Sequence, residues 1–292
     1  MKNISFFSYK GGSGRTSLLY NSLPFIAQQL GATNANPIIV LDLDVDSKGL
    51  SFLFPEKSAI NTIQILKGAQ AISVNSSEKD IRKHPFFKEL IPIGYRVGLP
   101  RELDESVLFA SAHPTNESNK YLGANSNLDA ASISLDDINR LCQRFGCKGI
   151  VMDTPAGGQL SGLAALDISD KIVTVMRITR QFREGTYEFL AEKSAKTCGV
   201  EYVIVPNVVP DTTDTDYVLE MFMDEIANRS CESVTPNNEV NLAMVEGLGI
   251  NEVRLFKFEE KNLFKEKQSR ELSTDEQEAI KKYQILAGEL VK

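Results

Sequence analysis

The stretch FFSYKGGSGRTSLL, residues 6–19, decides the fold, because it joins an apolar strand-like segment to an apolar helix-like segment through a glycine-rich turn. Gly11, Gly12 and Gly14 place no side chain between the backbone N–H groups of the turn and an approaching ligand. The N-terminus of the following helix adds partial positive charge at the same point. We therefore expect residues 11–17 to form a cradle for a phosphate group.

This turn departs from the common phosphate-loop pattern G-x-x-x-x-G-K-[ST]. Arg15 stands where that pattern has its lysine, and Lys10 lies five residues earlier. Thr16 supplies a hydroxyl of the type that binds Mg²⁺ in such loops, and Ser17 supplies a second hydroxyl near the phosphates. A glycine-rich turn alone is also consistent with an ordinary tight turn, so the interpretation depends on the rest of the chain.

Segments typical of buried parallel strands alternate with helical segments along the sequence. The expected strands are 4–7, 37–44, 148–153, 171–176 and 201–206, and the expected helices are 16–30, 134–145, 160–168, 181–198, 214–228 and 274–291. The alternation predicts an α/β fold, a mostly parallel twisted sheet with helices on both faces.

The region at about 70–130 fits this alternation poorly and is expected to be an elaboration of the domain. It contains strand-like segments at 90–99 and 106–112. The helix after it is expected to begin at Ser134, since S-L-D-D is typical of a helix start. Because no linker divides the chain, we expect one domain over residues 1–292.

Composition excludes several classes of protein. The net charge of −7 argues against broad, non-specific binding to DNA or to an anionic membrane. No segment reaches about 18 consecutive apolar residues, so no transmembrane helix is expected. The four cysteines form no C-x-x-C pair and indicate neither a zinc site nor a redox pair. With no signal-peptide pattern at the N-terminus, we expect a cytoplasmic protein.

Carboxylates follow two of the predicted strands. Asp42, Asp44 and Asp46 follow one strand, and Asp153 ends another within IVMDTPAG. Ligands of parallel α/β sheets bind at the carboxyl ends of the strands, so these acids are expected beside the glycine turn. Acids next to a phosphate loop are what a Mg²⁺–nucleotide site requires. The alternatives are a solvated turn for residues 42–46 and a helix N-cap for Asp153.

Together, YKGGSGRTS, LDLDVD and MDTPAGG resemble the deviant Walker A ATPases of the MinD/ParA group. That group has the pattern K-G-G-x-x-[K]-[ST], then a strand ending in D-x-D, then a strand ending in D-x-P-A-G. The resemblance extends to VIVPNVVPD, where the group places an asparagine against adenine, and Asn207 stands there. It covers most of the chain, and 70–130 is the poorly matched part.

The resemblance implies roles for the matching residues. Lys10 matches the signature lysine, which in this group reaches across a dimer to the partner's nucleotide. Asp44 matches the acid that helps to position the hydrolytic water, and Asp42 matches a neighbouring acid of switch I. Thr16 matches the Mg²⁺ ligand, and Asp153 matches the Walker B acid.

The cofactors implied are ATP and Mg²⁺. The implied metal ligands are Thr16, Asp42 and Asp153, and residues 155–158 match switch II. The implied catalytic residues are Lys10, Arg15 and Asp44. The implied nucleotide-binding residues are Gly11, Gly12, Ser13, Gly14, Arg15, Thr16, Ser17 and Asn207.

Arg15 is the departure from the family pattern, since the group usually has lysine there. Arginine keeps the charge and binds phosphate, but its planar fork is larger and more rigid. Variants reading K-G-G-x-G-R resemble a branch of this group, so we expect a working ATPase switch that positions or recruits a partner. One alternative is a nucleotide-binding scaffold with little hydrolysis. The other is a kinase- or synthetase-like metabolic enzyme on the same fold.

The resemblance also implies a nucleotide-dependent homodimer with an unidentified protein partner. Nucleic-acid binding stays open, because residues 253–270 carry six Lys or Arg against three Glu. The C-terminal segment has Ile280, Tyr283, Leu286, Ala287 and Leu290 at helical spacing, but few cations. We expect it to pack on the domain and not to lie on a membrane.

Overall fold

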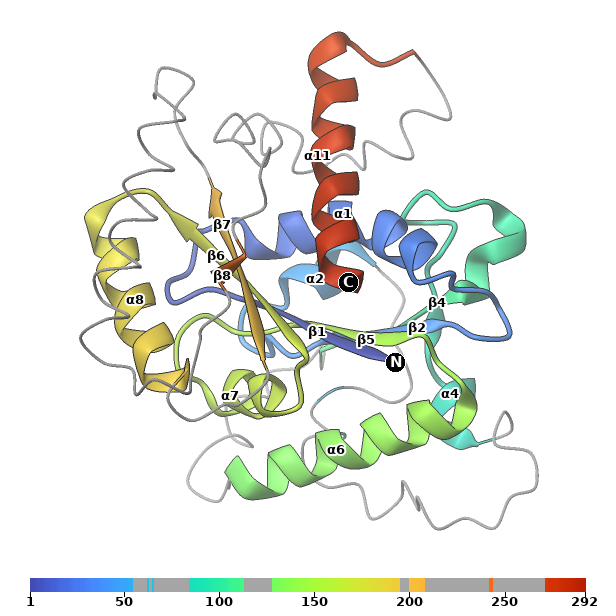
Figure 1. Cartoon of the computed structure of the whole chain (residues 1–292). Helices are drawn as coiled ribbons and strands as arrows, with labels where there is room; N and C mark the ends of the chain where they lie inside the picture. The colour runs from blue at the N-terminus through green and yellow to red at the C-terminus, as the bar shows by residue number, and fades with distance from the viewer. Residues whose placement is uncertain are drawn as a thin grey trace.

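The central feature of the computed structural model is one twisted sheet (Figure 1). The structure describes residues 1–54, 62, 65, 84–112, 128–194, 200–207, 242–243 and 271–292. Within these residues the sheet has eight strands in the order β3-β4-β2-β5-β1-β6-β7-β8. Every pairing is parallel except that of β3 with β4. The strands are β1 Lys2–Phe7, β2 Ile38–Asp42, β3 Ile91–Pro92, β4 Val107–Ala110, β5 Gly149–Asp153, β6 Lys171–Arg177, β7 Glu201–Asn207 and β8 Leu242–Ala243.

Helices cover both faces of this sheet, which confirms the predicted fold class. In Figure 1, α1, α2 and α11 lie above the sheet, while α6 and α7 lie below it. The helices are α1 Arg15–Gln29, α2 Gly49–Leu53, α4 Pro85–Lys88, α6 Leu128–Phe145, α7 Leu160–Asp167, α8 Arg180–Ser194 and α11 Thr274–Val291, with a 3₁₀ helix η2 at Arg101–Ser106. None of the described helices is long and apolar enough to cross a membrane.

Strand β1 shows why the sheet needs cover on both sides. Ile4 and Phe6 belong to the core beneath α1 and α11, whereas Phe7 belongs to the core beneath α8. The ring of Phe7 stacks on that of Phe189 in α8, with 4.2 Å between ring centres. Successive side chains of a strand point to opposite faces of the sheet. Phe6 and Phe7 therefore enter different cores, and β1 must be covered on both faces.

The predicted extent of several elements differs from the structure, and two of them differ most. Helix α6 begins at Leu128 and not at Ser134, because Ala131 is already buried against the sheet one turn before Leu135. The strand-like segment 90–99 contributes only Ile91–Pro92 to the sheet. The chain then turns back at Gly94, where a Cβ would lie 2.4 Å from the carbonyl oxygen of Leu103.

Other predictions fall outside the described residues. These are the helix at 214–228, the basic segment 253–270 and the end of the helix predicted at 181–198, beyond Ser194. Whether residues 1–292 form a single domain stays a prediction. The first and last helices of the described chain nevertheless share one core, since α11 packs on α1.

The structure confirms that the C-terminal segment, as α11, packs on the domain. The five apolar residues that share its predicted face are all buried: Ile280, Tyr283, Leu286, Ala287 and Leu290. The ring of Tyr283 stacks on that of Phe25 in α1, with 6.4 Å between ring centres. A capping box starts the helix, because Ser273 accepts from the Glu276 N–H and Glu276 accepts from the Ser273 N–H.

The capping box predicts a measurable contribution to stability. Ser273→Ala leaves the Glu276 N–H without its side-chain acceptor and should lower the free energy of unfolding by about 1 kcal/mol. Urea denaturation followed by circular dichroism measures this as a lower midpoint at unchanged slope. Gln284→Ala, at an exposed position of the same helix, is the control. Equal midpoints for Ser273→Ala and wild type would contradict the prediction.

Candidate functional site

Five neighbouring strands end at the same edge of the sheet and bring the predicted site residues together. In spatial order these strands are β2, β5, β1, β6 and β7. Asp42 ends β2, directly opposite Asp153 at the end of β5. The glycine turn follows β1, and Arg177 and Asn207 lie opposite each other at the ends of β6 and β7. The parallel register therefore aligns residues from five separate parts of the sequence.

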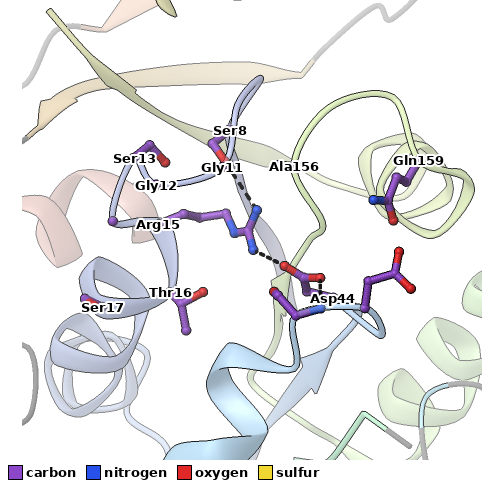
Figure 2. A pocket seen from close by; sticks show the side chains of 13 residues that line it. Ser8, Gly11, Gly12, Ser13, Arg15, Thr16, Ser17, Asp44, Ala156 and Gln159 are labelled. Atoms are coloured by element: carbon purple, nitrogen blue, oxygen red, sulfur yellow. Dashed lines mark hydrogen bonds and ion pairs between the residues drawn. The ribbon is translucent and has the colours of Figure 1, made fainter. Parts of the chain in front are cut away.

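A pocket of about 380 Å³ lies at this edge (Figure 2). That volume lies within the usual range for small-molecule sites. The pocket is bounded by the glycine turn, the first turn of α1, the segment after β2 and the segment after β5. Its lining residues are Ser8, Gly11, Gly12, Ser13, Gly14, Arg15, Thr16, Ser17, Asp44, Asp46, Ser47, Ala156 and Gln159.

The side chain of Arg15 bridges Asp44, which follows β2, and Asp153, which ends β5. Its Nε donates to Asp153 Oδ1 at 2.6 Å, and its Nη2 donates to Asp44 Oδ2 at 2.7 Å. Its Nη1 donates to Ser8 Oγ at 3.3 Å. Figure 2 shows the side chain reaching from the start of α1 toward Asp44. A lysine would have to make all three bonds from a single ammonium nitrogen, whereas the planar guanidinium makes each from a different nitrogen.

The electrostatics of this cluster follow from burial. Burial lowers the pKa of Arg15, but the charges of Asp153 and Asp44 outweigh it and hold the pKa above its usual value. Burial also raises the pKa of Asp153, against the opposing effect of Arg15. One guanidinium faces two carboxylates, so the ionised cluster carries a formal charge of −1. A phosphate entering the pocket therefore meets both a cation and an excess of negative charge.

Thr16 and Asp153 are suited to holding Mg²⁺. Thr16 Oγ1 donates to Asp153 Oδ2 at 2.8 Å; Thr16 lines the pocket, whereas Asp153 is fully buried behind it. Hydroxyl and carboxylate oxygens are hard donors, and Mg²⁺ commonly takes one or two carboxylates together with phosphate oxygens and waters. Among the described residues no group of three or more His, Cys, Asp or Glu is arranged to bind a metal alone. The Thr16 hydroxyl and the Asp153 carboxylate are two such oxygens, and phosphate and waters would supply the others.

Asp42, predicted as a metal ligand, makes other contacts. Its Oδ2 accepts from the N–H and the hydroxyl of Ser51, and its Oδ1 accepts from the Asp44 N–H. It is fully buried and is not among the residues that line the pocket. Burial, together with the charge of Asp153, raises the pKa of Asp42 to about 8. The geometry supports a role in holding the segment after β2, and its role as a ligand stays a prediction.

Lys10 and Asn207 also lie outside the lining of the pocket. Lys10 is half-buried at the start of the glycine turn. Asn207 is fully buried, and its Nδ2 donates to the carbonyl oxygen of Ser13 at 2.6 Å. The predicted roles of both residues, toward a second subunit and toward adenine, stay predictions.

Sequence reasoning missed several residues of this site. Ser8 contacts Arg15, Ser47 and Gln159 line the pocket, and Arg177 donates from Nε to the carbonyl oxygen of Gly12 at 2.7 Å. Arg177 could have been found, since it is the first charged residue after the strand segment IVTVM. Nothing in the sequence singles out Ser8 or Gln159, because their role depends on which strands are neighbours.

Comparison with known proteins gives matches to solved structures only. Neither models of protein families nor curated proteins match this chain. The MinC:MinD cell division complex of Aquifex aeolicus matches at 15% identity over 99% of this chain and 96% of that chain, with a TM-score of 0.57. A ParA family ATPase from Chlorobium tepidum TLS matches at 15% identity over 98% and 99%, with a TM-score of 0.55.

The chain has the MinD/ParA fold. A structure of pNOB8 ParA bound to nonspecific DNA adds a further match, at 13% identity over 97% of this chain and 96% of that chain, with a TM-score of 0.53. Each alignment spans nearly the whole of both chains, so the likeness is not confined to the glycine turn. At these identities the likeness concerns the fold, and the chemistry must be argued from this chain's own pocket.

The shifted pKa of Asp42 predicts how stability depends on pH. Between about pH 4 and 8 the folded chain keeps a proton on Asp42 that the unfolded chain has lost, so the free energy of unfolding falls as pH rises through this window. Asp42→Asn cannot ionise. The stability of wild type relative to this variant should therefore fall by about 1–4 kcal/mol from pH 5 to pH 8.

Urea titrations of both proteins at a series of pH values test this. Asp46→Asn, which alters an exposed carboxylate shortly after β2 ends, is the control and should track wild type. Parallel pH profiles for wild type and Asp42→Asn would show that Asp42 is not held protonated in the folded chain.

Proposed function

We propose that this chain binds Mg²⁺–ATP in the pocket at the glycine turn and hydrolyses it, acting as an ATPase switch of the MinD/ParA type. The observation that carries the proposal is the convergence of the glycine turn, the start of α1, Arg15 and Asp44 on one pocket, with the buried Asp153 held behind it by Arg15 and Thr16. Backbone amides and a helix N-terminus bind phosphate, and a Mg²⁺–nucleotide site needs acids for the metal and the attacking water, roles that we assign to Asp153 and Asp44.

Arg15 is the residue that we assign to the phosphates. A guanidinium has five N–H donors, and three of them are directed at Asp153, Asp44 and Ser8. The two remaining N–H groups can donate to a phosphate oxygen without breaking the ion pairs. Arg15 would then stabilise the charge that develops on the transferred phosphoryl group while keeping both acids in place.

Asp44 is the residue that we assign to the attacking water. Its carboxylate is at the pocket wall, held by Arg15 through Oδ2 and by the Ser47 N–H through Oδ1. Each oxygen keeps a further lone pair that can accept a proton from a water molecule. Thr16 and Asp153 would hold Mg²⁺, which when bound neutralises charge on the phosphates.

A second candidate function rests on the same ion pairs. Because Arg15 already binds both acids, the chain could bind ATP and turn it over slowly, so that the ATP-bound state itself is the signal. Slow turnover makes the protein a nucleotide-dependent scaffold. Measuring turnover and binding on one preparation separates the two functions.

Dimerisation and partner recruitment are part of the proposal. Related folds have been solved as a MinC:MinD complex and as ParA on nonspecific DNA. We propose an ATP-dependent homodimer of this chain that recruits a protein partner. Lys10 lies beside the pocket without lining it, which is compatible with a role toward the nucleotide of a second subunit.

The assignment of Asp44 predicts a selective loss of hydrolysis. Asp44→Asn keeps the shape of the side chain but removes the basic oxygen, so ATP turnover should fall at least about 100-fold. ATP affinity, measured by calorimetry with Mg²⁺, should change much less. Asp136→Asn, at an exposed acid that pairs with Arg140 on α6, is the control. Wild type that binds ATP without turnover would favour the scaffold, and wild type that binds no ATP would refute both functions.

The assignment of Lys10 predicts a loss confined to dimerisation. Lys10→Ala should still bind ATP as a monomer but should not dimerise with it, because alanine has no amine to bind the nucleotide of the second subunit. Sedimentation velocity with and without Mg²⁺–ATP measures this, and Lys88→Ala, an exposed lysine on α4, is the control. An ATP-dependent dimer of Lys10→Ala would contradict the assignment.

A further inference from the structure

The glycine turn is held from the side of β6 and β7, opposite the strands β2 and β5 beside which Asp44 and Asp153 lie. The carbonyl oxygen of Gly12 accepts from Arg177 Nε at 2.7 Å, and that of Ser13 accepts from Asn207 Nδ2 at 2.6 Å. Arg177 and Asn207 are register partners at the ends of β6 and β7. Two successive peptide groups of the turn are thus bound by two adjacent strand ends.

These two hydrogen bonds determine where the N–H groups of the turn point. In a planar trans peptide the C=O of one residue and the N–H of the next point in opposite directions. No cis peptide occurs in the described chain. Drawing the Gly12 carbonyl toward Arg177 therefore directs the Ser13 N–H away from β6. Drawing the Ser13 carbonyl toward Asn207 likewise directs the Gly14 N–H away from β7. Ser13 and Gly14 both line the pocket.

The turn needs such external contacts. Gly12 and Gly14 have φ values of 79° and 82°, in the left-handed region. Glycine populates positive and negative φ almost equally, so the sequence of the turn does not by itself hold the turn in one conformation. A side chain that binds each carbonyl removes this freedom before a ligand arrives. Preorganised donors bind an anion more tightly, because less ordering remains to be done on binding.

We propose that Arg177 and Asn207 are positioning residues that clamp the glycine turn, so that the Ser13 and Gly14 N–H groups are directed at a bound polyphosphate. The inference rests on the proposed function for its ligand and on the two hydrogen bonds for its geometry. We call the pair the β6–β7 clamp. It acts through the backbone of the turn and does not depend on which base the nucleotide carries.

Asn207 acquires a different role here from the one that the family resemblance implies. Its side chain is fully buried and does not line the pocket, and one of its two Nδ2–H groups donates to the turn. A residue that reads adenine must present its donor and acceptor to the base. A residue that clamps the turn instead affects every ligand that binds through phosphate.

Arg177 is suited to the clamp by its shape. The bond to Gly12 comes from Nε, in the middle of the guanidinium group, and the group lies 5.9 Å from the ring centre of Phe182. Lysine keeps the charge of arginine but has no donor at Nε. Arg177→Lys therefore separates a clamp from a simple positive charge near the phosphates.

The first test uses the nucleotide-free protein. Backbone ¹⁵N relaxation gives order parameters for the Ser13 and Gly14 amides, which should be about 0.85 in wild type and below about 0.6 in Arg177→Lys and Asn207→Ala. Asn3→Ala and Arg183→Lys are matched controls, since each removes a side-chain bond to a backbone carbonyl outside the turn. Unchanged order in both clamp variants would overturn the inference, whatever the protein binds.

The second test compares three ligands with Mg²⁺ present: ATP, GTP and inorganic tripolyphosphate. Each clamp variant should bind all three about 3- to 10-fold more weakly than wild type, the loss expected for one hydrogen bond. The ratio of ATP to GTP affinity should not change. A changed ratio with unchanged tripolyphosphate binding in Asn207→Ala would make Asn207 a reader of the base and overturn its place in the clamp.

The two tests keep the inference separate from the proposed function. If wild type binds none of the three ligands, the proposed function fails, and the order parameters still decide the clamp. If Arg177→Lys keeps full affinity for the three ligands and an ordered turn, Arg177 acts by its charge alone. The role of Arg177 in the clamp is then refuted. Arg177 is only half-buried, so its variant remains informative if Asn207→Ala does not fold.

Discussion

A single guanidinium between two buried carboxylates determines the geometry of this site. Arg15 belongs to the first turn of α1, Asp44 follows β2 and Asp153 ends β5, so the three side chains connect three elements of the fold. Without Arg15, both acids would lie buried with no opposing charge among the residues that the structure describes, which is strongly unfavourable. The start of α1 is thereby held against the strand ends, and with it the glycine turn that precedes the helix.

The turn is therefore anchored on both sides. Arg15 connects it to the acids of β2 and β5, and the β6–β7 clamp connects it to the opposite strands. Only the parallel sheet makes this possible, since it aligns five strand ends along one edge. An anionic ligand in the pocket would meet donors that are already in position, beside acids whose ionised cluster with Arg15 carries a formal charge of −1.

The sequence predicted the α/β class, the central strands and the acids beside the turn. Buried strands in a parallel sheet are continuous apolar runs, and IIVLD and GIVMD show this without any tertiary context. The failures came where local pattern and packing disagree. Ser134 has the residue type of a helix cap, but the burial of Ala131 extends α6 by more than a turn. At 90–99 the close approach of Gly94 to Leu103 ends the strand.

By itself the sequence determined that a phosphate-type turn, a helix start and strand-end acids exist in this chain, because each is encoded within a few consecutive residues. Only the tertiary structure decided how they connect. It directs Arg15 to Asp44 and Asp153, Asp42 to Ser51, and Arg177 and Asn207 to the carbonyls of the turn. The physical reason is that a hydrogen bond depends on distance in space. The order of strands in the sheet, which no local pattern encodes, sets those distances.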